Sequence, residues 1–178
     1  MTSRIETAPE TTICSGRAII FNRSGQVPIV QRHNTAHNNP GKWELVGGTI
    51  DEPDIASGIQ REALEEIGVG INVVSPIYGI YERPLNRGMN GKYLAVCALA
   101  ETIEAYPEVK LQKEEATAYE WATLDEILNH EEMTNTIRLA ILKLGEHAID
   151  MYFPNRFGVS ELIQEYMSDL PEFSHTDN

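Results

Sequence analysis

The chain has 178 residues, of which 42% are hydrophobic and 23% charged, so it suits one domain with a packed core and is too apolar for wholesale disorder. Its formal charge is −13, and the excess is local: residues 1–100 carry nine basic and ten acidic side chains, whereas residues 101–178 carry five and 17. So acidic a chain repels phosphate backbones and anionic lipid, which disfavours nucleic-acid polymers and membrane surfaces as partners.

Alternating apolar stretches, which are typical of strands, dominate the first third of the sequence. In chain order we expect a loose arm at residues 1–11, strands at 12–22 and 26–32, a polar loop at 33–42 with a Pro-Gly turn, and a short strand at 43–46. A short Arg-Ser-Gly turn separates the two longer strands, so they are predicted to form a hairpin. A Gly-Gly turn at residues 47 and 48 ends the short strand.

A helix is predicted over residues 54–67 because apolar residues recur every four positions, which places them on one face. These residues are Ile55, Ile59, Ala63 and Ile67. Pro53 suits the start of the helix, and Gly68 suits a left-handed cap at its end.

The second half of the chain contains three further strand patterns and then three helical patterns. The strands are expected at residues 71–81, 93–101 and 118–123, and the helices at 124–129, 135–147 and 160–170. This order predicts an α+β fold with a mixed sheet. We expect one domain at residues 12–147, followed by a C-terminal helical extension and tail at 148–178.

Three carboxylates lie close together on the predicted central helix. Glu62, Glu65 and Glu66 fall within an arc of about 100° beside the apolar stripe. Like charges at this spacing destabilise a helix by a few tenths of a kcal/mol per pair, so they need a cation or full solvation. Hard oxygen ligands select Mg²⁺, Mn²⁺ or Ca²⁺. A plain acidic solvent face is the alternative, and the helix alone does not separate the two.

The whole stretch of residues 43–69, WELVGGTIDEPDIASGIQREALEEIGV, resembles the signature of the Nudix hydrolases. The matching positions are Gly47, Gly48, Arg61, Glu62, Ala63, Glu65, Glu66, Gly68 and Val69. The resemblance extends over residues 12–144 and includes Trp43 and the segment 119–126. It implies an α/β/α sandwich around a mixed β-sheet.

The sequence departs from the family pattern between the Gly-Gly pair and Arg61. The family places a glutamate eight positions before this arginine, where the present chain has Pro53, because the connecting segment is one residue short. Glu52 or Asp54 is expected to take the place of that glutamate through a shifted loop.

The resemblance implies a metal-dependent hydrolysis in which Mg²⁺, or alternatively Mn²⁺, is held by the Gly47 carbonyl and by Glu62, Glu65 and Glu66, with Arg61 orienting one glutamate. The ion would neutralise a substrate diphosphate and activate water. The general base is expected to be Glu62 or a glutamate from a later loop. Glu114 and Glu115 are the loop candidates, with plain surface charge as the alternative.

The implied substrate is a small nucleotide, either a nucleoside triphosphate or deoxynucleoside triphosphate, or a compound of the ADP-ribose type. Arg32, Gly48 and Tyr81 are the candidates for substrate contacts. A domain that binds a nucleotide without turning it over is the alternative function. The chain is expected to be a monomer or a homodimer.

The expected location is the cytoplasm. Residues 1–12 contain no apolar segment typical of a secretory signal, and the longest apolar run is far shorter than the roughly 20 residues of a membrane span. Cys14 and Cys97 lie far apart, in no metal-ligand spacing, as in proteins of reducing compartments.

Overall fold

The computed structural model describes residues 11–85, 90–144 and 148–152. Its elements are β1 (Thr11–Phe21), β2 (Val27–Arg32), β3 (Trp43–Leu45), β4 (Gly47–Ile50), α1 (Ile55–Ile67), β5 (Ile71–Val73), β6 (Tyr78–Pro84), β7 (Gly91–Thr102), β8 (Ala116–Ala122), α2 (Leu124–Asn129), α3 (Asn135–Leu144) and α4 (Asp150–Tyr152). The predicted helix at 160–170 and residues 1–10 of the predicted arm lie outside the described residues.

The described strands form two sheets. The larger sheet has the order β4-β1-β7-β5, and β6 pairs with the first half of β7. β1 and β7 run parallel, whereas β4, β5 and β6 pair with their neighbours in antiparallel orientation. A smaller antiparallel sheet has the order β3-β2-β8. The predicted α+β class with a mixed sheet is confirmed.

The predicted hairpin between the first two strands is wrong. The chain does reverse after β1, and the Asn22 N–H donates to the Gln26 carbonyl at 2.9 Å. However, β1 is bonded on its two sides to β4 and β7, and β2 to β3 and β8. Because both sides of β1 are occupied, β2 joins the other sheet.

The strand predicted at residues 71–81 is divided into β5 and β6. The division falls at Ser75 and Pro76. Proline has no N–H to donate to a ladder. The Ser75 hydroxyl instead accepts the Leu99 N–H at 2.8 Å, which satisfies the β7 backbone where the strand is interrupted.

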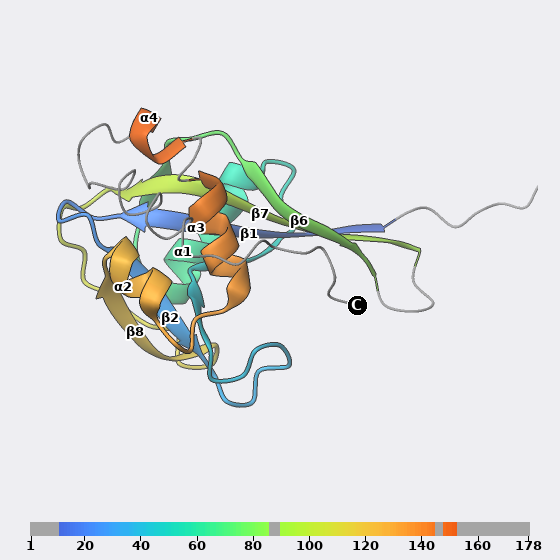
Figure 1. The fold of residues 1–178 in the computed structure, drawn as a ribbon, viewed down its shortest axis with the longest axis horizontal. Coiled ribbons are helices and arrows are strands. Elements are labelled where there is room, and N and C mark those ends of the chain that lie inside the picture. The colour runs from blue at the N-terminus through green and yellow to red at the C-terminus, as the bar shows by residue number, and fades with distance from the viewer. Residues whose placement is uncertain (1–10, 86–89, 145–147, 153–178) are drawn as a thin grey trace, which may run out of the picture.

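Helices cover both faces of the larger sheet (Figure 1). Along β1 the side chains alternate between two buried clusters: Ala18 and Ile20 pack with α1, and Ile19 and Phe21 pack in the cluster that contains α2 and α3. This alternation follows from the two-residue period of a strand. The predicted α/β/α sandwich is therefore confirmed.

α1 is bounded by the two signals that its sequence contains. The Asp54 carboxylate caps the start by accepting the N–H groups of Ala56 and Ser57 at 3.3 and 3.1 Å. Gly68 ends the helix in the left-handed conformation, with φ of 69°. Pro53 thus precedes the cap and does not occupy the first helical turn.

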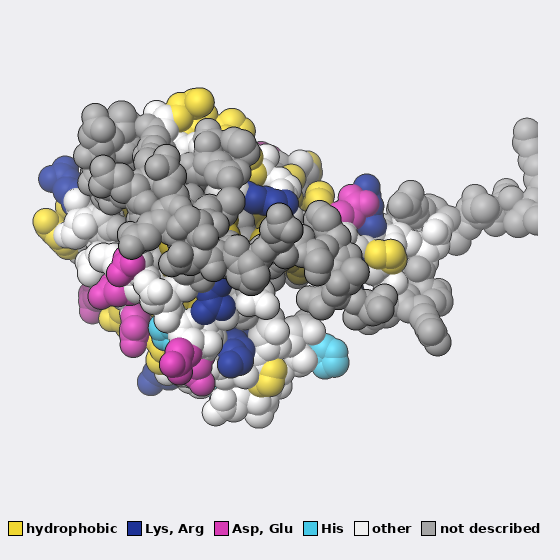
Figure 2. Space-filling view, in the orientation of Figure 1, with side chains coloured by type: hydrophobic (Ala, Val, Ile, Leu, Met, Phe, Trp, Pro, Cys, Tyr) yellow, Lys and Arg dark blue, Asp and Glu magenta, His cyan; other side chains and the backbone are white. Residues whose placement is uncertain are grey.

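On the face shown in Figure 2, acidic side chains of the described residues lie close to Lys and Arg side chains. The described part of this face therefore has no continuous basic patch of the kind that binds nucleic-acid backbones. Within the described ranges, no helix combines the length and apolar character needed to cross a membrane.

Candidate active site

The Gly-Gly pair forms the start of β4 and not the predicted turn. In the antiparallel register, Gly47 lies opposite Arg17 and Gly48 opposite Gly16. A Cβ at Gly47, where φ is 140°, would overlap the Gly16 carbonyl oxygen, and a Cβ at Gly48 would overlap the Glu62 carboxylate. Gly47 is therefore needed for β4 to lie this close to β1, and the absence of a side chain at Gly48 leaves room for the Glu62 carboxylate in its present position.

Glu66 is a buried carboxylate held against this glycine pair. Only 6% of the residue is exposed, and its Oε2 accepts the Gly47 N–H at 3.0 Å. Burial raises the pKa of Glu66 to about 7, and the nearby charges of Glu44 and Glu115 act in the same direction. The Gly47 hydrogen bond and the Arg17 charge oppose this rise in the pKa.

Glu62 lies one turn earlier on the same side of α1. Burial raises its pKa, the Arg61 guanidinium opposes the rise, and the charges of Glu65 and Glu115 add to it. Glu115, which directly precedes β8, is thus among the charges that act on both Glu62 and Glu66. Glu115 and its neighbour Glu114 are both exposed residues of this loop, and of the two predicted loop residues it is Glu115 whose charge is among the main influences on the pKa values of the α1 carboxylates.

Arg61 connects α1 to the loop that follows β4. Its guanidinium donates to Glu62 at 2.8 Å, to Glu65 at 2.6 Å and to the Thr49 carbonyl at 3.0 Å, and its Nε donates to Glu52. Of the two residues expected to replace the missing glutamate, the structure places Glu52 beside Arg61. The other, Asp54, caps α1.

The three predicted carboxylates of α1 therefore differ in their surroundings. Glu62 and Glu66 lie against the glycine pair, whereas the Glu65 side chain is 56% exposed and paired with Arg61. In the described residues, no three His, Cys, Asp or Glu side chains are arranged to hold a metal ion. The donors are nevertheless hard oxygens that repel one another, and this chemistry fits Mg²⁺ or Mn²⁺. Arg61 donates to Oε1 of Glu62, and Oε2 of the same carboxylate lies toward Gly48.

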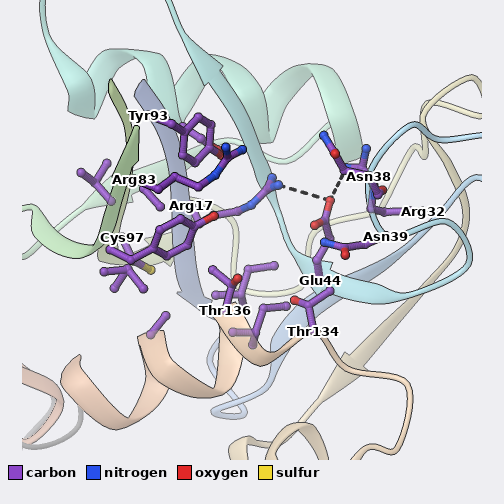
Figure 3. A pocket seen from close by; sticks show the side chains of 18 residues that line it. Arg17, Arg32, Asn38, Asn39, Glu44, Arg83, Tyr93, Cys97, Thr134 and Thr136 are labelled. Carbon is purple, nitrogen blue, oxygen red and sulfur yellow. Dashed lines mark hydrogen bonds and ion pairs between the residues drawn. The ribbon is translucent and has the colours of Figure 1, made fainter. Parts of the chain in front are cut away.

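A cavity of about 250 Å³ lies on the other face of the larger sheet, lined by residues of β1, β6, β7 and α3 (Figure 3). Three arginines line it, namely Arg17, Arg32 and Arg83, and Glu44 is the carboxylate among its lining residues. So basic a cavity within an acidic chain favours an anionic ligand.

Glu44 holds two of these arginines. Its Oε1 lies 3.3 Å from Arg17 Nη2 and accepts from Arg32 Nη1 at 2.5 Å, as the dashed lines in Figure 3 show. Arg32 also donates to the Asn38 carbonyl at 2.8 Å, which fixes the polar loop at the cavity. Arg32 was expected from the sequence to contact substrate, and it does line this cavity.

Two tyrosines and an arginine form the other side of the cavity. The Tyr81 and Tyr93 rings stack with centroids 6.0 Å apart, and the Arg83 guanidinium lies 4.8 Å from the Tyr93 centroid. Burial raises the pKa of Tyr81. The structure thus brings the predicted residues Arg32 and Tyr81 to one cavity, whereas the predicted Gly48 lies with the carboxylates of α1.

Arg17 was missed by sequence reasoning. It lines the cavity, and its Nη1 donates to the Gly47 carbonyl oxygen. A signal was present, because Arg17 is the one charged residue of β1, TTICSGRAIIF, and directly precedes its apolar run AIIF. What the sequence does not contain is the register that places Arg17 opposite Gly47.

Comparisons with known proteins agree with this geometry. The sequence matches the NUDIX domain family over residues 15–144. It is 28% identical over 153 residues to a prenyl-diphosphate phosphatase of Methanosarcina mazei, covering 78% of this chain and 86% of that protein.

Two solved structures are also similar. One is a MutT protein from Methanosarcina mazei Go1, with a TM-score of 0.55, 21% identity, and coverage of 92% of this chain and 100% of the other. The second is a bifunctional NMN adenylyltransferase/ADP ribose pyrophosphatase from Francisella tularensis complexed with AMP and a Mn ion, with a TM-score of 0.58, 20% identity, and coverage of 80% and 43%. At these identities the likeness shows a shared fold.

Proposed function

The chain belongs to the NUDIX domain family, and from this premise we propose that it hydrolyses the diphosphate bond of a small nucleotide with the help of Mg²⁺ or Mn²⁺. Membership makes it a hydrolase acting on diphosphate bonds, as the resemblance of residues 43–69 predicted. The observation that carries the nucleotide proposal is the arginine- and tyrosine-lined cavity joined through Arg17 to the Gly47 carbonyl. We assign the hydrolase domain to residues 12–147, which the family match at 15–144 supports.

The ion would be held by the Gly47 carbonyl and by Glu62 and Glu66, with Glu65 available beside them. When bound, it would neutralise the diphosphate and lower the pKa of a coordinated water. Arg61 would keep α1 in register with the loop after β4 through its bonds to Glu52 and Thr49. The cavity arginines would hold the anionic substrate.

For the proton of the attacking water we propose Glu115 as the general base. Glu62, the other candidate, would hold the ion and is bound to Arg61, whereas Glu115 is exposed and lies near enough to Glu62 and Glu66 for its charge to act on both. A base must be free to accept a proton within reach of the water. We expect Glu115→Gln to reduce kcat more than Glu114→Gln does, and the reverse order would contradict the assignment.

The polar cavity favours a nucleotide over an alkyl diphosphate. A base can stack on the Tyr81 and Tyr93 rings and accept hydrogen bonds from the surrounding arginines and asparagines. An alkyl chain would displace the water around these polar groups without replacing its hydrogen bonds, which costs free energy. A prenyl diphosphate is the second candidate, and the similarity to the Methanosarcina mazei phosphatase supports it.

The test is a substrate panel assayed with the full chain and Mg²⁺ or Mn²⁺. The panel contains nucleoside triphosphates, ADP-ribose and a short prenyl diphosphate, with product release followed by chromatography. We expect the highest kcat/KM for a nucleotide. The highest value for the prenyl compound would favour the second candidate, and tight nucleotide binding without product would favour the non-catalytic alternative.

A further inference from the structure

The site has two halves: the glycine pair with the carboxylates of α1, and the arginine- and tyrosine-lined cavity. Arg17 contacts both halves. It projects from the middle of β1, and its side chain is 19% exposed. Its Nη1 donates to the Gly47 carbonyl, and its Nη2 lies 3.3 Å from the Glu44 carboxylate in the cavity. The β1–β4 register fixes this placement, because Arg17 pairs directly with Gly47.

The contact with Gly47 concerns an oxygen that has a second proposed partner. The Gly47 carbonyl is also the backbone ligand proposed for the divalent ion. A carbonyl oxygen has two lone pairs and can accept from two partners. However, a guanidinium and a divalent ion on the same oxygen would lie close together and repel each other strongly. The guanidinium and a divalent ion therefore compete for this oxygen.

The cavity offers Arg17 an alternative role. Arg17 and Arg32 share a single carboxylate, Glu44, so their two positive charges are only half balanced by it. A guanidinium released from Gly47 remains tethered at Glu44, and its planar fork matches the oxygens of a phosphate.

We propose that Arg17 is a switch residue that donates to the Gly47 carbonyl in the ligand-free protein and turns to the substrate's diphosphate when a divalent ion binds. This proposal rests on the proposed function and adds a coupling between the two halves of the site. The ion and a diphosphate then bind with positive cooperativity, because each favours the same position of Arg17.

The experiment measures Mn²⁺ binding to the full chain by electron paramagnetic resonance, without substrate and then with methylenediphosphonate, a diphosphate that is not hydrolysed. Arg17→Met removes the competing cation, so we expect Mn²⁺ alone to bind about three- to tenfold tighter than in the unaltered protein. The gain in Mn²⁺ affinity caused by methylenediphosphonate should shrink by a similar factor. Arg23→Met is the matched control, because Arg23 is an exposed arginine in the turn after β1, and it should change neither value.

The outcomes are distinguishable. Unchanged or weaker Mn²⁺ binding in Arg17→Met, with normal binding in the unaltered protein, overturns the switch and leaves the proposed function standing. Absence of Mn²⁺ binding in the unaltered protein overturns both. Arg17→Met leaves Glu44 paired with Arg32, so the buried carboxylate keeps a partner. Should the variant not fold, Arg17→Gln tests the same point, since a neutral amide can still donate a hydrogen bond to the Gly47 carbonyl or to Glu44 but carries no charge that repels the ion, and tighter Mn²⁺ binding is again expected.

Discussion

The two halves of the site are built in different ways. The carboxylate half consists of Gly47, Gly48, Glu62 and Glu66, which lie within one strand-loop-helix segment of the chain. The cavity half takes its residues from β1, the β2–β3 region, β6, β7 and the start of α3. One short segment can hold the groups that act on a diphosphate in a fixed arrangement. A cavity built from distant segments can be altered by substitution to bind a different ligand, and the groups that act on the diphosphate stay in place.

The sharpest test of the carboxylate half is Glu66→Gln. The buried carboxylate is a proposed ligand of the ion, so its loss should lower kcat by about a hundred- to a thousandfold. The measurement is the initial rate on the best substrate of the panel, with circular dichroism as the control for folding. A loss of less than tenfold would remove Glu66 from the proposed ligands.

The glycine pair should determine stability as well as chemistry. Gly47→Ala places a Cβ against the Gly16 carbonyl at a φ of 140°, so we expect the free energy of unfolding to fall by about 3 kcal/mol. Urea denaturation measures this change. Gly79→Ala is the matched control, since its Cβ would meet no atom within 4 Å, and an equal loss in both variants would contradict the explanation.

The raised pKa of Glu66 predicts a pH dependence of stability in the metal-free protein. Its pKa in the folded chain is about 7, against an ordinary value of 4.5, so the folded state keeps a proton that the unfolded state releases between these values. Stability therefore falls as the pH rises through this window, and Glu66→Gln should remove about 2–3 kcal/mol of that fall.

The measurement compares urea unfolding of the two proteins in EDTA at pH 5 and pH 8. The free energy of unfolding of Glu66→Gln, relative to that of the unaltered protein, should increase from pH 5 to pH 8. Glu65→Gln, at a half-exposed position on the same helix, controls for the loss of one charge. The prediction would be contradicted if the free energy of unfolding changed with pH by the same amount in Glu66→Gln and in the unaltered protein.

The cavity half should determine which substrate is used. Tyr81→Leu keeps an apolar side chain but removes the ring that stacks on Tyr93, so the KM for a nucleotide should rise about tenfold with little change in kcat. The KM for a prenyl diphosphate should rise less. Tyr119→Leu, on β8 and outside the residues that line the cavity, is the control. An equal rise for both substrates would argue against base stacking.

The smallest expected effect is at the start of α1. Asp54→Ala removes the cap that accepts the Ala56 and Ser57 N–H groups, which should lower the free energy of unfolding by about 1 kcal/mol. Thermal unfolding should show a decrease in Tm of about 2–4 °C. Asp51→Ala, at an exposed position of the same loop, should change the Tm less, and an equal decrease would show that α1 does not depend on this cap.

The sequence by itself determined α1, its Gly68 cap, the α+β class and the family, because these depend on the spacing of neighbouring residues and on a contiguous motif. Only the tertiary structure decided that β1 and β2 belong to different sheets, that Glu52 takes the place beside Arg61, and that Arg17 meets Gly47. The physical reason is that periodicity reports which face of an element is buried, whereas strand partners depend on which edges remain free once the whole chain has packed.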